Sequence, residues 1–134
     1  MQLLKNLFLE KKIEVQLNLK EDLPLVKSDF NQMKQVVLNL LQNSIDATPS
    51  DGFIEVDSTN TNKHVIVKMR DTGTGISESE PNIVFEPFFT TKVTGVGLGL
   101  ANVKKIIKDH DGSISVKNRP KEGVEFTIKL PIPI

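Results

Sequence analysis

Apolar and polar residues alternate in several short stretches of this chain, which is the pattern of a strand with one buried face. The first stretch runs from Lys12 to Lys20 and places Ile13, Val15, Leu17 and Leu19 on one side. Four further stretches of the same kind lie at residues 53–58, 64–70, 113–118 and 124–130. The alternation therefore predicts about five strands.

Two other segments have the period of an amphipathic helix. One runs from Asp29, a suitable N-cap, to Thr48, after which Pro49 and Gly52 end it. The second covers residues 98–109, and residues 1–11 have the pattern of the end of a preceding helix. The sequence thus predicts about three helices packed on a mixed sheet of about five strands, which is a two-layer α/β (α+β) sandwich. We expect a single domain over residues 1–134.

Composition narrows the functional classes. The chain carries 17 basic and 17 acidic residues, so its formal net charge is zero, and it has no cysteine. A neutral chain lacks the basic surface of a nucleic-acid binder or a membrane-surface binder, and disulfides are excluded. We therefore expect no nucleic acid and no direct membrane contact. We expect a soluble, cytoplasmic domain, whether or not a longer parent protein is anchored in a membrane.

The helix from Asp29 has two distinct faces when its residues are placed at steps of 100°. One arc is apolar and is expected to face the core: Phe30, Met33, Val37, Leu40, Leu41 and Ile45. The opposite arc holds five amides and one carboxylate: Gln32, Gln35, Asn39, Gln42, Asn43 and Asp46. Solvated helix faces are more often filled with Lys and Glu, which form helices better than Asn does. Amide oxygens suit a hard cation such as Mg²⁺, so the amide arc is either a binding face or an ordinary solvated one.

A short acidic and glycine-rich motif follows the strand at residues 64–70. It reads Asp71-Thr72-Gly73-Thr74-Gly75. Glycines allow a backbone to approach a flat ligand closely, and an ionised carboxylate only accepts hydrogen bonds, which favours a base with an exocyclic amino group. The simpler alternative is a plain turn, because Asp and Gly are common turn residues.

A second glycine motif, Gly95-Val96-Gly97-Leu98-Gly99-Leu100, opens the helix at residues 98–109. Free backbone N–H groups and the helix dipole at such an N-terminus favour a phosphate. The motif is neither a dinucleotide-binding G-x-G-x-x-G nor a P-loop, because Leu100 replaces the last glycine and no Gly-Lys-Ser/Thr triplet occurs.

In this order the motifs resemble the GHKL ATPase superfamily, which includes gyrase B, a heat-shock chaperone, histidine kinases and mismatch-repair ATPases. Asn39–Asn43 is similar to the N box of histidine kinases, and Asp71–Gly75 to the first glycine box. Phe85–Lys92 resembles the F box, which the other branches lack, and Gly95–Leu100 the second glycine box. The resemblance spans about residues 13–130 and is closest to nitrogen-regulation-like and sporulation-like sensor kinases.

The resemblance implies an ATP-binding catalytic domain with the GHKL fold. Asn43 would bind Mg²⁺, Asp71 would bind the adenine amino group, and residues 76–96 would form a lid over the nucleotide. Phe85 would anchor that lid or simply pack in the core. The positions implied to bind ATP are Asn39, Asn43, Asp46, Asp71, Gly73, Gly75, Ile76, Phe85, Phe88, Lys92, Gly95, Gly97, Leu98, Gly99 and Leu100.

Two positions depart from the family pattern. Asp46 lies where many members carry a lysine that touches phosphate, so it would act through the metal, through water or not at all. Val96 replaces a small hydroxyl residue. Both changes affect the expected phosphate contacts and neither opposes ATP binding.

The phosphoacceptor is missing from this sequence. Family members phosphorylate a histidine on a helical hairpin, and the two histidines here, His64 and His110, lack that setting and are expected at the surface. The resemblance therefore implies a fragment, inactive alone, that transfers the γ-phosphoryl group of Mg-ATP to a histidine on a separate dimerisation and phosphoacceptor domain, with a response regulator as the next partner. The alternatives are a non-catalytic nucleotide-sensing module and an anti-sigma-factor-like serine kinase.

Overall fold

The structure is a computed structural model, and it describes residues 12–77, 79–87, 99–120 and 122–133. Its elements, in chain order, are β1 (Glu14–Leu19), α2 (Phe30–Ala47), β2 (Phe53–Asn60), β3 (His64–Asp71), the 3₁₀ helix η1 (Pro81–Phe85), α3 (Gly99–Asp109), β4 (Ser113–Asn118) and β5 (Val124–Pro131). The five strands and two later helices predicted from the sequence are confirmed, with ends that shift by at most two residues. The helix predicted over residues 1–11 lies outside the described residues.

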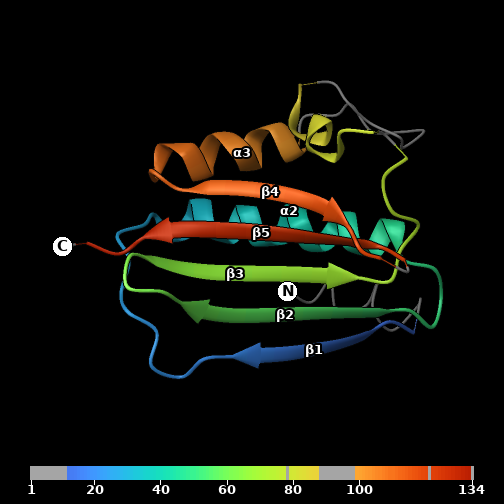
Figure 1. Cartoon of the computed structure of the whole chain (residues 1–134), viewed down its shortest axis with the longest axis horizontal. Helices are drawn as coiled ribbons and strands as arrows, with labels where there is room; N and C mark the ends of the chain where they lie inside the picture. Colours follow the sequence, from blue (N-terminus) through green and yellow to red (C-terminus); the bar gives the residue numbers. More distant parts are fainter. Residues whose placement is uncertain (1–11, 78, 88–98, 121, 134) are drawn as a thin grey trace.

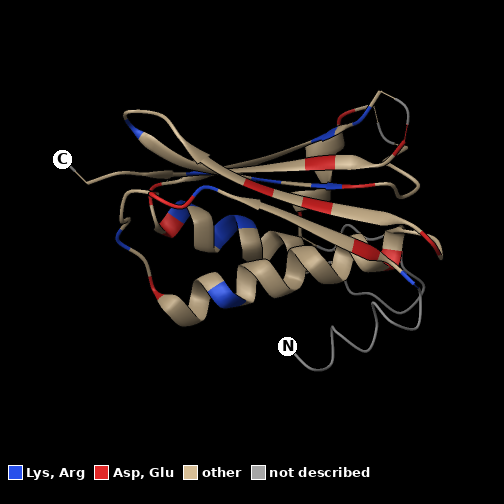
Figure 2. Cartoon of the chain, turned by 90° about the horizontal axis from the view of Figure 1, so that it is seen from below, with Lys and Arg blue, Asp and Glu red and all other residues tan. Residues whose placement is uncertain are grey.

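The strands form one mixed sheet in the order β1-β2-β3-β5-β4 (Figure 1). β1 and β2 are parallel because α2 returns the chain to the end of the sheet at which β1 begins, and the other three pairs are antiparallel. In the part of the chain that the structure describes, the two α-helices lie on one face of the sheet and no α-helix lies on the other (Figure 2). This is the predicted two-layer α+β architecture. None of the described helices combines the length and the hydropathy that a membrane span requires.

Local signals in the sequence set the ends of α2. The Asp29 side chain accepts a hydrogen bond from the backbone N–H of Gln32 at 3.0 Å, as an N-cap does. At the other end the Thr48 N–H bonds the carbonyls of Ser44 and Ile45, and Pro49 follows. The cap and the proline therefore place the amide arc of α2 where the sequence predicts it.

The core lies between the sheet and the helices, and one part of its prediction is wrong. Leu40, Leu41 and Ile45 are buried as predicted, but Phe30 is 78% exposed and Val37 is 45% exposed. Val36, which falls between the two predicted arcs, is buried instead. Helical period gives the direction of a side chain, but it does not encode how far the neighbouring elements extend along the helix.

Candidate functional site

The predicted binding residues that the structure describes belong to elements that meet at one end of the domain. The C-terminal ends of β3 and α2, the beginning of α3 and the turn between β4 and β5 all lie there (Figure 1). A backbone hydrogen bond of 3.2 Å from Thr74 N–H to the Ala47 carbonyl joins the first glycine motif to the end of α2. Two motifs separated by about 30 residues in the sequence are thus neighbours in space.

Asp71, the last residue of β3, is buried at this end. Its Oδ1 accepts backbone N–H groups from Gly73 at 2.9 Å and from Val124 at 3.3 Å. Burial raises the pKa of the Asp71 carboxyl above its usual value, and the two N–H donors counteract part of that effect. The carboxylate is therefore held in one orientation by the backbone.

Two glycines make room for this arrangement. A side chain on Gly73 would put its Cβ 2.6 Å from the Ala47 carbonyl oxygen, so only glycine lets the motif approach α2. Gly123, in the β4–β5 turn, has φ +77°, and a Cβ there would lie 1.9 Å from the Asp71 carbonyl oxygen. Gly123 was missed in the sequence, where it is an ordinary turn residue. Both glycines permit the backbone packing around Asp71.

The amide arc of α2 supplies the second part of the site. The Asn43 side-chain nitrogen donates to the Asn39 carbonyl at 2.9 Å, and both residues are half-buried. Because this bond uses the nitrogen, the amide oxygen is the atom that Asn43 can offer to a cation. One turn further, Asp46 accepts a 2.9 Å hydrogen bond from the Gln42 side chain.

A metal at this end would need ligands beyond those of the described chain. No three His, Asp or Glu side chains in the described residues lie close enough together to hold an ion. One amide oxygen suits a hard cation whose other ligands come from phosphates and water. The residues present are consistent with Mg²⁺ carried by a nucleotide.

The first part of the predicted lid is packed against the domain. Val84 and Phe85 of η1 are buried, and the Phe85 ring meets the Phe126 ring edge to face with centroids 6.1 Å apart. The Lys104 ammonium lies 6.0 Å from the centre of the Phe85 ring. Core packing is thus the role of Phe85 that the structure shows, and the short helix at Pro81–Phe85 was not predicted.

The second glycine motif is described only in part. Gly99 and Leu100 form the first turn of α3, with Gly99 exposed and Leu100 partly buried against the core. Val103 and Ile107 of the same helix are completely buried, which fixes the position of that first turn. The remaining predicted positions lie outside the described residues: Phe88, Lys92, Gly95, Gly97 and Leu98.

Neither histidine resembles an acceptor. The Nδ1 of His110 lies 2.8 Å from the Ile106 carbonyl, and its Nε2 accepts the Asp29 N–H at 3.0 Å. His110 is therefore half-buried between the end of α3 and the beginning of α2, and not a surface residue as the sequence suggested. Both ring nitrogens are engaged in hydrogen bonds, so neither presents a free lone pair for phosphorylation. His64 begins β3, at the end of that strand opposite Asp71.

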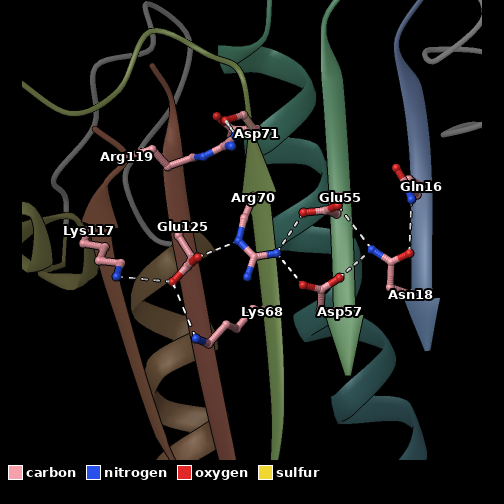
Figure 3. A network of polar contacts seen from close by, with 10 residues as sticks. All are labelled: Gln16, Asn18, Glu55, Asp57, Lys68, Arg70, Asp71, Lys117, Arg119 and Glu125. Carbon is pink, nitrogen blue, oxygen red and sulfur yellow. Dashed lines mark hydrogen bonds and ion pairs between the residues drawn. The ribbon is translucent and has the colours of Figure 1, made fainter. Parts of the chain in front are cut away.

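Residues at the end of β4 also contact the site, although the sequence did not indicate them. The Asn118 side chain makes two hydrogen bonds to the backbone of Ile76, both 2.8 Å long. The Arg119 guanidinium donates to the Asp71 carbonyl at 2.9 Å (Figure 3). These contacts join chain segments more than 40 residues apart, and neither residue belongs to a recognisable motif.

A charged network lies on the sheet face opposite the helices, around Arg70, the residue that precedes Asp71 (Figure 3). Arg70 donates to Glu55 at 2.9 Å, to Glu125 at 2.6 Å and to Asp57. The Asn18 side chain donates to Asp57 at 2.8 Å and to Glu55 at 3.2 Å. Arg70 is thus the cation shared by three carboxylates on the two strands that flank β3.

The protonation equilibria of this network follow from its contacts. The hydrogen bond from Arg70 lowers the pKa of Asp57 below its usual value. Burial alone would raise the pKa of Glu125, but the hydrogen bond and charge of Arg70, with the charges of Lys117 and Lys68, outweigh burial and hold that pKa below the usual value. The pKa of Arg70 is raised, chiefly by its hydrogen bond to Asp57.

Comparison with known proteins identifies this arrangement. Residues 28–134 match the family model described as histidine kinase-, DNA gyrase B- and HSP90-like ATPase. Sporulation kinase E of Bacillus subtilis is 38% identical over 122 residues, which are 90% of this chain and 16% of that protein. The sensor histidine kinase ZraS of Escherichia coli K12 is 36% identical over 124 residues, covering 92% of this chain and 27% of ZraS.

Solved structures show the same fold. The nucleotide-free catalytic domain of the histidine kinase ThkA superimposes with a TM-score of 0.82 at 33% identity, covering 98% of this chain and 92% of that one. A complex of ThkA with the response regulator protein TrrA matches with a TM-score of 0.82 at 32% identity, over 98% of this chain and 38% of ThkA. The chain spans less than a third of the curated relatives it matches. It belongs to the family of histidine kinase-, DNA gyrase B- and HSP90-like ATPases, and its relatives are sensor histidine kinases.

Proposed function

We propose that this chain binds Mg-ATP and donates its γ-phosphoryl group to a histidine on a separate phosphoacceptor domain of a two-component sensor kinase. The observation that carries the proposal is the buried Asp71 carboxylate at the end of β3, held by two backbone N–H groups beside the amide arc of α2. Family membership supports the class of activity, and the geometry around Asp71 and Asn43 supports the residue roles that we propose.

Asp71 defines the base end of the proposed site. Its Oδ1 accepts the Gly73 and Val124 N–H groups, and the Ser44 hydroxyl also hydrogen-bonds the carboxylate. We assign the second carboxylate oxygen, which can accept more than one hydrogen bond, to the adenine amino group. The lack of a side chain at Gly73 lets the backbone of the motif pack against the Ala47 carbonyl at the end of α2 and holds Asp71 in place.

Asn43 defines the metal and phosphate end. Bound Mg²⁺ supplies charge stabilisation for the transferring phosphoryl group. Asn43 presents its amide oxygen to the ion, and its bond to the Asn39 carbonyl holds the amide in that orientation. The Asp46 carboxylate accepts a hydrogen bond from Gln42 and would repel a phosphate, so it acts through the ion, through water or not at all.

The first turn of α3 completes the phosphate end. A Cβ on Gly99 would meet no atom of the described residues within 4 Å, so their packing does not itself require glycine there. Free N–H groups at this N-terminus, together with the helix dipole, favour an anion. We propose that position 99 is a glycine because the triphosphate approaches the backbone there.

Transfer to a second domain tests the proposal as a whole. The purified chain should bind ATP in calorimetry yet carry no stable label after incubation with radiolabelled ATP, because His64 begins a strand and both nitrogens of His110 are engaged in hydrogen bonds. Adding the phosphoacceptor hairpin of the parent protein should give a phosphoprotein labile in acid and stable in alkali. The rate should be low, because the tether that normally concentrates the acceptor is absent.

Two outcomes contradict the proposal in different ways. A chain that does not bind ATP would refute the assignment of the site. A chain that binds ATP and alters the affinity of its partner, but never labels the histidine, would be a nucleotide-sensing module.

Replacement of Asn43 by alanine tests the metal end separately. N43A should lose most of the Mg²⁺-dependent part of ATP affinity, because one ligand of the ion is removed. The unfolding free energy of the free protein should change by less than about 1 kcal/mol, since Asn43 is off the apolar arc. Calorimetric titrations with and without Mg²⁺ measure the effect. Q35A, which removes an exposed amide two turns away on the same arc, is the control, and an N43A protein with unchanged Mg²⁺ dependence would contradict the assignment.

A further inference from the structure

We propose that Asn118 is a positioning residue for the base end of the ATP site, because it fixes the chain immediately after the Asp71–Gly75 motif. This inference rests on the proposed function. Asn118 is the last residue of β4, the edge strand of the sheet. No nucleotide-binding motif includes it.

The contact is unusually complete for one side chain. The Asn118 Oδ1 accepts the Ile76 N–H at 2.8 Å, and its Nδ2 donates to the Ile76 carbonyl at 2.8 Å. One amide thus pairs with both backbone groups of one residue, as a neighbouring strand would do. The Ile76 backbone thus makes the same number of hydrogen bonds to Asn118 as it would make to a paired residue of a neighbouring strand.

The two hydrogen bonds between Asn118 and Ile76, called the clamp below, lie next to a residue at which the backbone can change conformation easily. Gly75 has φ +78°, a conformation that glycine enters and leaves at little cost. Nearby, the Asn82 side chain accepts the Val116 N–H at 3.0 Å. β4 therefore contacts the chain that follows the base motif at two points, Ile76 and Asn82 of η1.

The same hairpin also supports Asp71 itself. Arg119 donates to the Asp71 carbonyl at 2.9 Å, and the Val124 N–H donates to the Asp71 carboxylate at 3.3 Å. The Arg119 N–H bonds the Gly123 carbonyl at 2.9 Å and closes the turn. Asn118 extends this frame from Asp71 to Ile76, so the two ends of the motif keep a fixed separation.

A fixed motif favours binding because its ordering does not have to occur when the nucleotide arrives. Without the clamp, the chain after Gly75 samples other conformations, and ATP must select the competent one. Apparent affinity then falls by the fraction of molecules that are competent. The Asn118 side chain is exposed, so its replacement creates no core cavity and the variants are expected to fold.

Two substitutions test the clamp. N118A removes both hydrogen bonds, and N118D keeps the acceptor for the Ile76 N–H while it turns a second acceptor toward the Ile76 carbonyl. We expect each to raise the Kd for ATP and for ADP by roughly five- to tenfold, where tenfold corresponds to about 1.4 kcal/mol. The increase should be the same with and without Mg²⁺, because the clamp acts on the base end. N60A is the matched control, since the Asn60 amide also bonds a backbone carbonyl but lies at the far end of β2.

A second measurement separates positioning from simple stability. Amide hydrogen exchange at residues 73–77 of the nucleotide-free protein should be faster in N118A than in the wild type and unchanged in N60A. The midpoint of thermal unfolding should shift by only a few degrees. Wild-type affinity in either Asn118 variant, or an affinity loss without faster local exchange, would overturn the role of Asn118. Failure of the wild-type protein to bind ATP would instead refute the proposed function.

Discussion

Replacement of Asp71 by asparagine is expected to weaken ATP binding by about tenfold to a hundredfold while the fold remains intact. The asparagine Oδ1 can keep the hydrogen bonds from Gly73 and Val124, and its nitrogen then occupies the position of the second carboxylate oxygen. A donor would face the adenine amino group, and a buried polar group left unpaired costs on the order of 1–3 kcal/mol. Calorimetric titration with ATP at neutral pH measures the loss.

Two further measurements serve as internal controls: the affinity for GTP compared with ATP, and the pH dependence of ATP binding. Guanine presents a carbonyl oxygen where adenine has its amino group, so GTP should bind the wild type several-fold more weakly than ATP, and D71N should reduce that preference. Burial raises the pKa of Asp71, so this carboxyl should take up a proton at a higher pH than an ordinary aspartate does. ATP binding should therefore weaken as the pH is lowered. D71N should lack this component of the pH dependence. Equal ATP affinities for D71N and the wild type would show that Asp71 does not read the base.

Replacement of Arg70 by alanine should lower the free energy of unfolding by about 2–3 kcal/mol. The substitution leaves Glu55, Asp57 and Glu125 beside one another without their shared cation, and carboxylates that lose such a partner are strongly destabilising. Urea denaturation at neutral pH measures the difference. K117A is the control, because Lys117 contacts the same Glu125 at 3.6 Å but is 72% exposed, and exposed ion pairs contribute about 0–1 kcal/mol.

The effect of R70A should depend on pH in a defined direction. The pKa values of Asp57 and Glu125 are lowered in the folded wild type, so their contribution to stability is present above the unfolded pKa values and disappears as pH falls through the folded ones. The difference between wild type and R70A should therefore shrink as the pH falls below about 4. The raised pKa of Asp71 acts in the opposite direction, but it is common to both proteins and cancels. A stability difference that stays constant down to pH 2 would show that the network is not electrostatic.

Alternation and capping in the sequence were enough to predict the elements, since each strand and helix end has a local cause. Asp29 is an N-cap in the structure as in the prediction, and the strand at Ser113–Asn118 has the predicted ends. The placement of β5 between β3 and β4 is not local. It depends on pairing of residues about 60 positions apart, which no single-sequence pattern encodes.

The candidate site likewise contains residues that the sequence indicates and residues that only the folded structure brings together. Asp71 and Asn43 could be proposed from the sequence, because a carboxylate and an amide suit a base and a cation and the motif resemblance singles out these two positions. Asn118 and Gly123 could not, because each acts by meeting a distant part of the backbone, Ile76 in one case and Asp71 in the other. The core shows the same limit. The helical period predicts the direction of the Val37 side chain, but it does not predict that neighbouring elements leave Val37 exposed and bury Val36.

The contacts of His110 make it a built-in spectroscopic reporter. Because its Nε2 accepts the Asp29 N–H and its Nδ1 faces the Ile106 carbonyl, the neutral ring is held as the Nδ1–H tautomer. The two ring nitrogens then have separate ¹⁵N resonances that reveal the tautomer directly. Any movement of the end of α3 relative to the beginning of α2 breaks one of these bonds and changes the spectrum. A single natural side chain thus allows NMR to follow the packing of the two helices during nucleotide titration, without a dye or an engineered label.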